Sequence, residues 1–104
     1  MMLILGASED QLPVYLEARR RGIETIGVDV RADRPGLAHA DAWLPVSIKD
    51  HDGIVAALGG RRPDAVVAAA SDAGLWSWHE LSHRYELPFR FPAGAARSVS
   101  LCQR

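Results

Sequence analysis

A short loop near the start of the chain combines residue types that bind polar ligands. Residues 6–11, with the sequence Gly-Ala-Ser-Glu-Asp-Gln, join an apolar run at 2–5 to an amphipathic stretch. Between a strand and a helix, such a loop presents amide N–H groups that the helix leaves unpaired, at the positive end of the helix dipole. This arrangement predicts a site for an anionic or polar ligand. The predicted ligand-binding residues of the loop are Gly6, Ala7, Ser8 and Gln11.

A second polar turn follows the apolar run at 65–69. Ser71 and Asp72 stand in this turn, and a helical pattern begins at Ala73. Serine and aspartate are favoured helix N-caps, so capping alone is one interpretation of Ser71, of Asp72 and of Ser8. A cap also faces the end of the preceding strand, where a ligand would lie. We therefore add Ser71 and Asp72 to the predicted substrate-binding residues.

One stretch matches the H-E-x-x-H pattern of zinc hydrolases, with His79, Glu80 and His83 at the pattern positions. Two histidines four residues apart on a helix can share a zinc ion, and the glutamate can act as a base. A catalytic zinc needs a third protein ligand, but Glu86 and Phe89 occupy the places of the glycine and histidine of the extended pattern. We therefore predict no metal site and no catalytic residue. The preferred interpretation is a polar helix face opposite three buried residues, which are Leu75, Trp78 and Leu81.

The elements that would position these side chains alternate between strands and helices along the whole chain. Asp50 is the predicted N-cap of the second helix, and a single helical turn is predicted near 37–40. The strands are predicted at 2–5, 24–30, 42–46 and 65–69, and the helices at 11–21, 51–58, 73–85 and 93–103, with an extended segment at 89–92.

The first helix carries competing start signals. Ser8 and Gln11 have the spacing of a capping box, and Asp10 is an alternative cap. Pro13 is compatible only with the first turn of a helix, which favours a start near Gln11. Gly22 is predicted to end the helix in the left-handed conformation.

Right-handed crossovers arrange these strands in the order 3-2-1-4. The sequence therefore predicts an α/β, Rossmann-like three-layer domain, with a four-stranded parallel sheet and helices on both faces, formed by residues 1–104. The winding direction reverses between the first and fourth strands, and ligands of such sheets bind at that reversal, outside the carboxyl ends of the strands. The loops 6–8 and 70–72 should meet there. Asp29 either rims this crevice or merely ends the second strand.

Composition excludes several classes of partner. The net charge of -1 gives no electrostatic basis for binding nucleic acid, and the apolar run at the N-terminus is too short to span a membrane. Cys102 is the only cysteine, so no internal disulfide is possible, and we expect a soluble protein in the reducing cytoplasm. His39 and His51 are predicted to be isolated surface residues. The tryptophans are predicted to pack against the core, namely Trp43, Trp76 and Trp78.

Taken in order, a set of short motifs resembles the N-terminal (pre-ATP-grasp, or biotin-carboxylase N-terminal-like) domain of ATP-grasp carboxylate–amine ligases. Their spacing covers essentially the whole chain, and the opening Gly-Ala-Ser with Gln-Leu-Pro and a later Ser-Asp is the most specific part. The matching pieces are Leu3-Ile4-Leu5-Gly6-Ala7-Ser8, Gln11-Leu12-Pro13, Gly27-Val28-Asp29, Pro35-Gly36, Ala40-Asp41-Ala42, Ser71-Asp72, Leu87-Pro88 and Arg104.

The resemblance implies a substrate-side and structural role. In that family, ATP lies between two ATP-grasp subdomains, a carboxylate is activated as an acyl phosphate, and an amine attacks it. The implied partners of this chain are a small-molecule carboxylate or amine and the ATP-grasp catalytic domains. The implied cofactors, ATP and magnesium, belong to the full-length ligase.

The sequence departs from the family near its end. Ser100 stands where the family usually has a lysine, and Lys49 is the only lysine of the chain. The sequence contains no nucleotide-binding lysine pair, no glycine-rich phosphate loop and no carboxylate pair for magnesium. We therefore expect a fragment, a separately expressed domain or one part of a split enzyme, which does not catalyse the reaction alone.

Two other functions remain open. A dinucleotide-binding or sensor module is suggested by Gly6 together with Asp29, which stands near the position of a ribose-binding acid. Against it, Ser8 and Gln11 replace the second and third glycines of the G-x-G-x-x-G pattern. The other alternative is a structural dimerisation domain, in which apolar surface around the last helix forms a homodimer.

Overall fold

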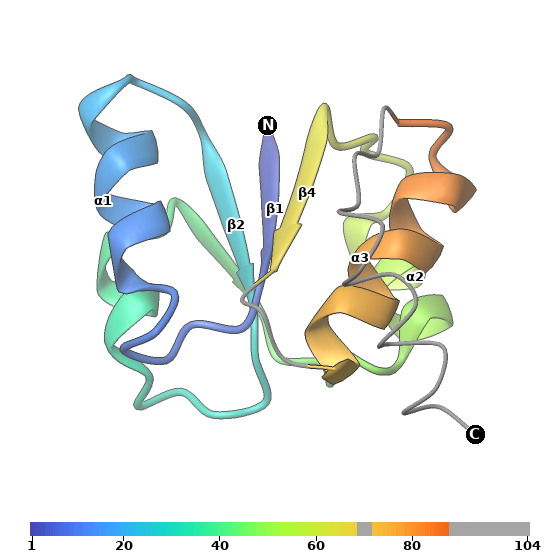
Figure 1. The fold of residues 1–104 in the computed structure, drawn as a ribbon, viewed down its shortest axis with the longest axis horizontal. Coiled ribbons are helices and arrows are strands. Elements are labelled where there is room, and N and C mark those ends of the chain that lie inside the picture. The colour runs from blue at the N-terminus through green and yellow to red at the C-terminus, as the bar shows by residue number, and fades with distance from the viewer. Residues whose placement is uncertain (69–71, 88–104) are drawn as a thin grey trace.

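The computed structural model of the protein describes residues 1–68 and 72–87. For residues 72 and 73 it describes the backbone alone. Strands and helices alternate along this part of the chain (Figure 1). The strands are β1 (Met2–Leu5), β2 (Thr25–Val28), β3 (Ala42–Leu44) and β4 (Ala65–Ala68). The helices are α1 (Leu12–Arg20), α2 (His51–Leu58) and α3 (Asp72–Arg84), and a 3₁₀ helix, η1, spans Pro35–His39.

The four strands form one parallel sheet in the order β3-β2-β1-β4, which confirms the predicted topology. Leu5 at the end of β1 pairs with Val28 of β2 and with Ala68 of β4. The loops that follow these strands therefore leave from the same edge of the sheet. The reversal of winding falls between β1 and β4, as the sequence predicts.

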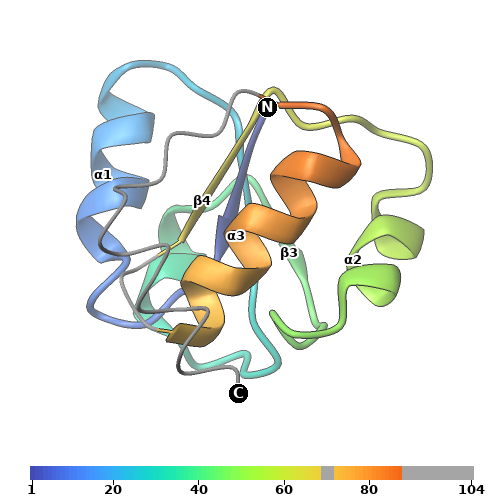
Figure 2. The ribbon, with the colours of Figure 1, turned by 45° about the vertical axis from the view of Figure 1, so that its right-hand side comes forward.

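Helices lie on both faces of the sheet. Helices α2 and α3 lie on one face, and α1 lies on the other with η1 beside it (Figures 1 and 2). Alternate residues of each strand point to opposite faces, so two core clusters result. The smaller, beneath α1, consists of Ile4, Ala7 and Tyr15. The larger, beneath α2 and α3, consists of Leu3, Leu5, Ile26, Val28, Ile54, Leu58, Val66 and Leu81.

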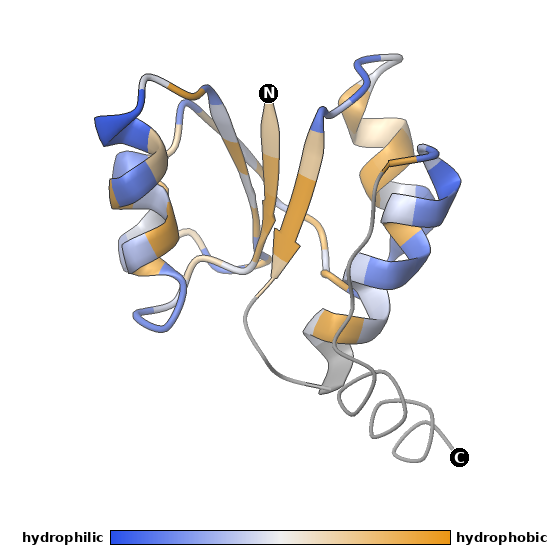
Figure 3. Cartoon of the chain, turned by 45° about the horizontal axis from the view of Figure 1, so that its top comes forward, coloured by the Kyte–Doolittle hydropathy of each residue, from blue (hydrophilic) through white to orange (hydrophobic). Residues whose placement is uncertain are grey.

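Hydropathy follows the same division. In Figure 3 the neighbouring strands β1 and β4 are mostly hydrophobic, whereas hydrophilic residues lie on the outer sides of the helices. Leu3, Ile4 and Leu5 are between 0% and 1% exposed. Burial of each of these side chains contributes about 2 kcal/mol of hydrophobic stabilisation. A continuous apolar run, covered on both faces, is what a central parallel strand requires.

The ends of α1 and α2 show how local sequence sets the boundaries. Gly22 has φ +70°, its N–H donates to Arg19 O at 3.1 Å, and Ile23 N–H donates to Ala18 O at 2.9 Å. This pattern is a Schellman motif, and it confirms the predicted end of α1. Asp50 caps α2 as predicted, because its Oδ1 accepts a hydrogen bond from Gly53 N–H at 3.0 Å.

Helix α3 ends in the same way, but without a glycine. Glu86 N–H donates to His83 O at 3.1 Å and Leu87 N–H donates to Ser82 O at 2.8 Å. Glu86 therefore takes the left-handed position, with φ +56°, and it is the one non-glycine residue with positive φ among those described. A side chain in this conformation costs about 1 kcal/mol relative to glycine.

Several predicted bounds change in the structure. The second strand was predicted at 24–30 but pairs only over Thr25–Val28, because the chain turns away at Asp29 to enter the loop toward η1. The extended segment at 89–92 and the helix at 93–103 lie outside the described residues. Within the described ranges, no helix has both the length and the apolar character needed to cross a membrane.

Candidate functional site

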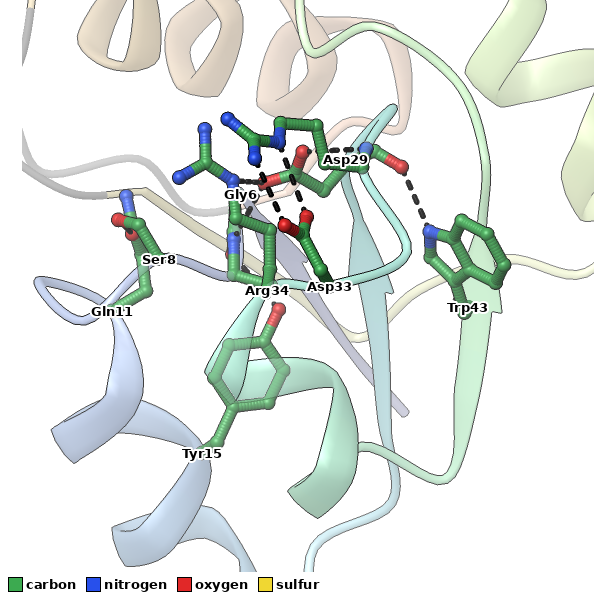
Figure 4. A network of polar contacts seen from close by, with 10 residues as sticks. Gly6, Ser8, Gln11, Tyr15, Asp29, Asp33, Arg34 and Trp43 are labelled. Atoms are coloured by element: carbon green, nitrogen blue, oxygen red, sulfur yellow. Dashed lines mark hydrogen bonds and ion pairs between the residues drawn. The ribbon is translucent and has the colours of Figure 1, made fainter.

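The predicted site residues gather at the carboxyl edge of the sheet. Gly6, Ala7 and Ser8 follow β1 directly, and Gln11 precedes the first turn of α1. Asp72 begins α3 at the same edge, after β4. Ser71 lies outside the described residues, as does Ala70. Figure 4 shows the first-turn loop, residues 6–11, beside the loop that follows β2.

The first two amides of the first-turn loop are already paired. Gly6 N–H donates to Val28 O at 2.7 Å, and Ala7 N–H donates to Asp29 Oδ2 at 3.1 Å. The prediction that the loop's amides are free is therefore wrong for these two residues, because the neighbouring strand supplies acceptors that sequence does not show. The amides of residues 8–10 have no protein partner in the described part of the chain. Any anion that binds here would meet these three donors.

Ser8 and Gln11 contact each other in a way that the capping-box prediction did not anticipate. Ser8 Oγ donates to Gln11 Oε1, and Gln11 N–H donates to Ser8 O at 3.0 Å. Gln11 itself takes the N-cap position without a side-chain cap, so Ser8 and Asp10 do not cap α1. The caps considered at Ser8 and Asp10 are therefore not formed, whereas the helix start near Gln11, which Pro13 favoured, is confirmed. The Gln11 side chain instead covers Gly6, where an added Cβ would lie 3.0 Å from Gln11 Nε2.

Tyr15 anchors the first-turn loop through a hydrogen bond from its hydroxyl group. Its side chain is fully buried, and its hydroxyl donates to Gly6 O at 2.8 Å. An added Cβ would lie 2.6 Å from Tyr15 Oη at Gly27 and 2.7 Å from Tyr15 Cε2 at Gly36. Burial raises the pKa of Tyr15, and the nearby Asp29 carboxylate raises it further, so the phenol stays a donor.

Gly36 joins the first-turn loop to the segment that follows β2. Its N–H donates to Ala7 O at 2.7 Å, which ties η1 to the first-turn loop. The sequence did not predict that Tyr15, Gly27 and Gly36 support the site. The Pro35-Gly36 pair signalled a turn, but nothing in its spacing indicated that the turn packs against the Tyr15 ring.

Both carboxylate oxygens of Asp29 accept hydrogen bonds from the protein backbone. Its side chain is 12% exposed, with Oδ2 accepting from Ala7 N–H and Oδ1 accepting from Arg31 N–H at 3.0 Å. Arg34 Nε lies 3.5 Å from Asp29 Oδ2, and the Trp43 indole N–H donates to Asp29 O at 2.7 Å. Asp29 therefore joins the loops after β1 and β2, and a ribose hydroxyl would have to compete with two backbone donors for its carboxylate.

A hollow of about 310 Å³ lies between these two loops. Arg31 forms a two-fold ion pair with Asp33, which lowers the pKa of Asp33. Arg34 Nε is buried without a hydrogen-bond partner, beside Asp29. The hollow thus presents carboxylates and guanidinium groups together, which suits a small polar molecule better than a strong polyanion. Its lining residues are Ser8, Glu9, Asp10, Arg31, Asp33, Arg34 and Pro35.

A larger hollow, of about 430 Å³, lies at the opposite, amino edge of the sheet, where Arg19 and His39 contribute to its lining. Arg19 Nη1 and His39 Nδ1 lie 3.5 Å apart in an exposed contact. Asp41 is occupied there, because its Oδ2 accepts from Thr25 N–H at 2.8 Å. Ligands of open parallel sheets bind at the carboxyl edge, so we assign the candidate site to the smaller hollow despite its size.

The zinc-like pattern lies on an outer face of α3. His79 and His83 are exposed, and Glu80 is half-buried. Leu81 is buried, whereas Leu75 and Trp78 are only partly buried. Within the described ranges, no three metal-binding side chains come together.

Some surface predictions are wrong. His51 is not isolated, because its Nε2 lies 3.0 Å from Ser77 Oγ in the contact between α2 and α3. Trp43 and Trp76 are 40% and 36% exposed rather than packed in the core, while Trp78 packs against the larger cluster. Trp43 lies on the edge strand β3, and Trp76 lies on the outer side of α3. The residues around each tryptophan in the sequence do not indicate that it is exposed.

Comparisons with known proteins find relatives among ATP-grasp ligases. No protein-family model matches it. It is 36% identical over 66 residues to the formate-dependent phosphoribosylglycinamide formyltransferase of Pelobacter propionicus. The match covers 64% of this chain and 17% of that protein. The chain therefore corresponds to a small part of the length of this relative.

Solved structures extend the likeness. The structure of phosphoribosylglycinamide synthetase from Anaerococcus prevotii matches with a TM-score of 0.72 and 28% identity, over 84% of this chain and 22% of that one. N5-carboxyaminoimidazole synthetase from Staphylococcus aureus, complexed with ADP, matches with a TM-score of 0.64 and 16% identity, over 84% and 23%. The predicted resemblance to the N-terminal domain of ATP-grasp ligases is confirmed.

The fold is also shared outside ligases. UDP-glucose 4-epimerase from Thermotoga maritima matches with a TM-score of 0.63 and 18% identity, over 83% of this chain and 35% of that one. The fold alone therefore does not distinguish a ligase domain from a domain of an epimerase. The sequence similarity and the local chemistry of the first-turn loop must do so.

Proposed function

We propose that this chain is the substrate-side N-terminal domain of an ATP-dependent carboxylate–amine ligase, and that residues 1–104 form one domain that is not catalytic by itself. The observation that carries the proposal is the 36% identity to a formate-dependent phosphoribosylglycinamide formyltransferase. The structural match to phosphoribosylglycinamide synthetase supports it. Both names contain phosphoribosylglycinamide, as the molecule that is formylated in one enzyme and synthesised in the other.

In this proposal the carboxyl-edge hollow holds part of the carboxylate or amine substrate. The free amides of residues 8–10 would donate to an anionic oxygen, and the carboxylates of Glu9 and Asp10 would accept from an amine. Tyr15 and Asp29 do not touch the substrate. They fix the loops that present these groups, which keeps the orientation of the bound molecule constant.

The described residues do not fit ATP or magnesium. Lys49 is exposed and is the only lysine, and no carboxylate cluster of metal-binding size occurs in the described ranges. We propose that ATP and magnesium bind to ATP-grasp domains outside this chain, and that these domains are its protein partners. Titrating the chain with magnesium–ATP should give no saturable binding and no phosphate release.

The direct test is a calorimetric titration of the chain with phosphoribosylglycinamide. We expect saturable binding that weakens in Ser8→Ala, because this serine fixes Gln11 and lines the hollow. Ser47→Ala is the matched control, since that serine is outside the hollow and accepts from Lys49 N–H at 3.2 Å. Equal weakening in both variants, or no binding to the unaltered chain, would contradict the proposal.

A dinucleotide-binding module is the second candidate, suggested by the Gly6 turn after β1 and by Asp29 after β2. It predicts quenching of tryptophan fluorescence by NADH, because Trp43 lies beside Asp29. The engagement of both Asp29 oxygens by backbone donors argues against it. Saturable quenching at micromolar NADH would favour this candidate over the ligase domain.

Two finer points belong to the proposal. A cytoplasmic location is supported by the single cysteine. A homodimer is the remaining partner hypothesis, and sedimentation velocity over a range of protein concentrations would detect it as a rising mean mass.

A further inference from the structure

Arg34 lies in the lining of the carboxyl-edge hollow, and its guanidinium group has a donor that the protein does not use. The side chain is 36% exposed, yet its Nε atom is buried and has no hydrogen-bond partner. In Figure 4 the terminal nitrogens of Arg34 point away from Asp29. A guanidinium group has five N–H donors and no acceptor, so only an acceptor can satisfy it.

Asp29 is close to Arg34 but does not satisfy it. Arg34 Nε lies 3.5 Å from Asp29 Oδ2, which is an ion-pair distance and too long for a strong hydrogen bond. Both Asp29 oxygens already accept from backbone donors, which are Ala7 N–H at 3.1 Å and Arg31 N–H at 3.0 Å. Within the described ranges, the terminal nitrogens of Arg34 have no acceptor. The contact with Asp29 therefore orients the side chain and leaves its terminal donors available.

The other arginines show that an unused guanidinium group is unusual in this protein. Elsewhere in the described part of the chain, each arginine makes a hydrogen bond or a close polar contact through its guanidinium group. Arg31, which lines the same hollow, bonds to both carboxylate oxygens of Asp33 at 3.1 and 2.9 Å. Glu9 and Asp10 also line the hollow, but neither is bonded to Arg34. Arg34 thus keeps its terminal donors although carboxylates lie nearby.

The backbone around Arg34 is held in place. Arg34 precedes Pro35 and has φ -71° and ψ 136°, the extended conformation that a residue before proline favours. Beyond the proline, Gly36 N–H donates to Ala7 O at 2.7 Å. Leu37 N–H donates to Arg34 O at 3.2 Å. A side chain on a fixed backbone has less freedom to lose when a ligand binds, which raises its contribution to affinity.

The charges around Arg34 define the class of molecule that the hollow suits. A guanidinium fork matches the oxygens of a carboxylate or a phosphate, and either group would meet the unused donors of Arg34. Glu9 and Asp10 are exposed carboxylates in the same lining, and they favour an amino group. The hollow therefore suits a small molecule that carries one oxyanion and one amino group.

We infer that Arg34 determines the specificity of the carboxyl-edge hollow by binding the oxyanion of a small molecule through its terminal N–H groups. The identity of that molecule as a ligase substrate rests on the proposed function. Under that proposal, the oxyanion is the phosphate of phosphoribosylglycinamide. The recognition of an oxyanion by Arg34 can be tested separately.

The first test compares two ligands and two variants in calorimetric titrations. Arg34→Gln should weaken the binding of phosphoribosylglycinamide roughly tenfold to hundredfold, because a hydrogen bond between charged groups is lost. The same variant should bind ribosylglycinamide, which lacks the phosphate, as tightly as the unaltered chain does. Arg31→Gln is the matched control, because it removes the same charge from the same hollow.

The control should weaken binding much less, since the Arg31 guanidinium group is already bonded to Asp33. Equal weakening in Arg34→Gln and Arg31→Gln, or the same loss for both ligands in Arg34→Gln, would overturn the inference. The proposed function would still stand in that case, because the unaltered chain would bind phosphoribosylglycinamide.

A second test applies if phosphoribosylglycinamide does not bind or if Arg34→Gln does not fold. Inorganic phosphate, titrated into the unaltered chain, should saturably shift the nuclear magnetic resonance signal of the Arg34 Nε–H group. The signal of the Arg20 Nε–H group, which donates to Glu17 at 3.0 Å, should stay in place. A shift of the Arg34 signal without binding of phosphoribosylglycinamide would contradict the proposed function and support the inference. An unmoved Arg34 signal, or equal shifts of both signals, would overturn the inference.

Discussion

The two edges of the sheet carry hollows of similar polarity that are built in different ways. At the carboxyl edge, buried or nearly buried groups hold the loops, with Tyr15 bonded to Gly6 O and Asp29 bonded to two backbone amides. At the amino edge, lining residues of the larger hollow make exposed side-chain contacts, such as Glu24 with Arg61 and Arg19 with His39. Buried polar contacts fix geometry, whereas exposed ion pairs contribute little. The candidate site is therefore identified by the buried contacts that hold its loops in place, and not by the volume of its hollow.

The largest expected effect comes from filling the space beside Tyr15. Gly27→Ala places a Cβ 2.6 Å from Tyr15 Oη and 2.9 Å from Leu37 Cδ2, so the ring must move. We expect a loss of about 3 kcal/mol in the free energy of unfolding, measured by urea denaturation. Gly22→Ala, which meets no atom within 4 Å, should lose only about 1 kcal/mol through its positive φ. Equal losses would show that the Tyr15 ring is not tightly packed.

Removing one buried hydroxyl tests the same support more selectively. Tyr15→Phe leaves Gly6 O without its donor, and we expect a loss of about 1–2 kcal/mol by chemical denaturation. Arg61→Ala, which removes an exposed pair with Glu24 at the other edge, should lose less than about 0.5 kcal/mol. The contrast between the edges fails if the arginine variant is the less stable of the two.

A stabilising change is expected outside the lining of both hollows. Glu86→Gly removes the side chain from a left-handed residue at the end of α3, where φ is +56°. The free energy of unfolding should rise by about 0.5–1 kcal/mol. Glu80→Gly, in the interior of the same helix, should lower it by about 1 kcal/mol, which makes the pair a control for position. A fall in stability for Glu86→Gly would contradict the assigned helix end.

The smallest effect concerns pH. Hydrogen bonds from Arg20 and Arg21 lower the pKa of Glu17 from its ordinary 4.5 to about 2. Because the folded pKa lies below the unfolded one, the contribution of Glu17 is complete above the unfolded value and is lost as pH falls toward about 2. Glu17→Gln should therefore flatten the fall in thermal midpoint between pH 4.5 and 2. An unchanged slope would show that this exposed cluster does not affect folding.

Local signals predicted the framework of the domain well. The apolar run at 2–5, the N-cap Asp50 and the helix end at Gly22 depend on residues close in sequence, and each is confirmed. The order of the strands followed from the handedness of crossovers, which is a property of the backbone. No alignment was required for any of these features.

The interior of the site was not predictable in the same way. Asp29 was expected either to rim the crevice or merely to end the second strand. Its carboxylate instead accepts from Ala7 N–H, 22 residues away, because β1 and β2 are neighbours in register. The packing of Gly36 on Tyr15 depends on the path of the loop after β2, which sequence spacing does not determine. Conversely, the zinc-like pattern is complete over its short span but its histidines lie on an exposed helix face. Local patterns predicted elements, and long-range contacts determined which side chains are available.

The most direct test of the account is a nuclear magnetic resonance titration of the whole chain with phosphoribosylglycinamide. The account predicts saturable shifts of the amide signals of residues 8–10 and of the loop at 31–35, with the signals around Arg19 and His39 unchanged. Shifts confined to the amino-edge hollow, or the absence of any shift at saturating ligand, would contradict the assignment of the substrate site to the carboxyl edge.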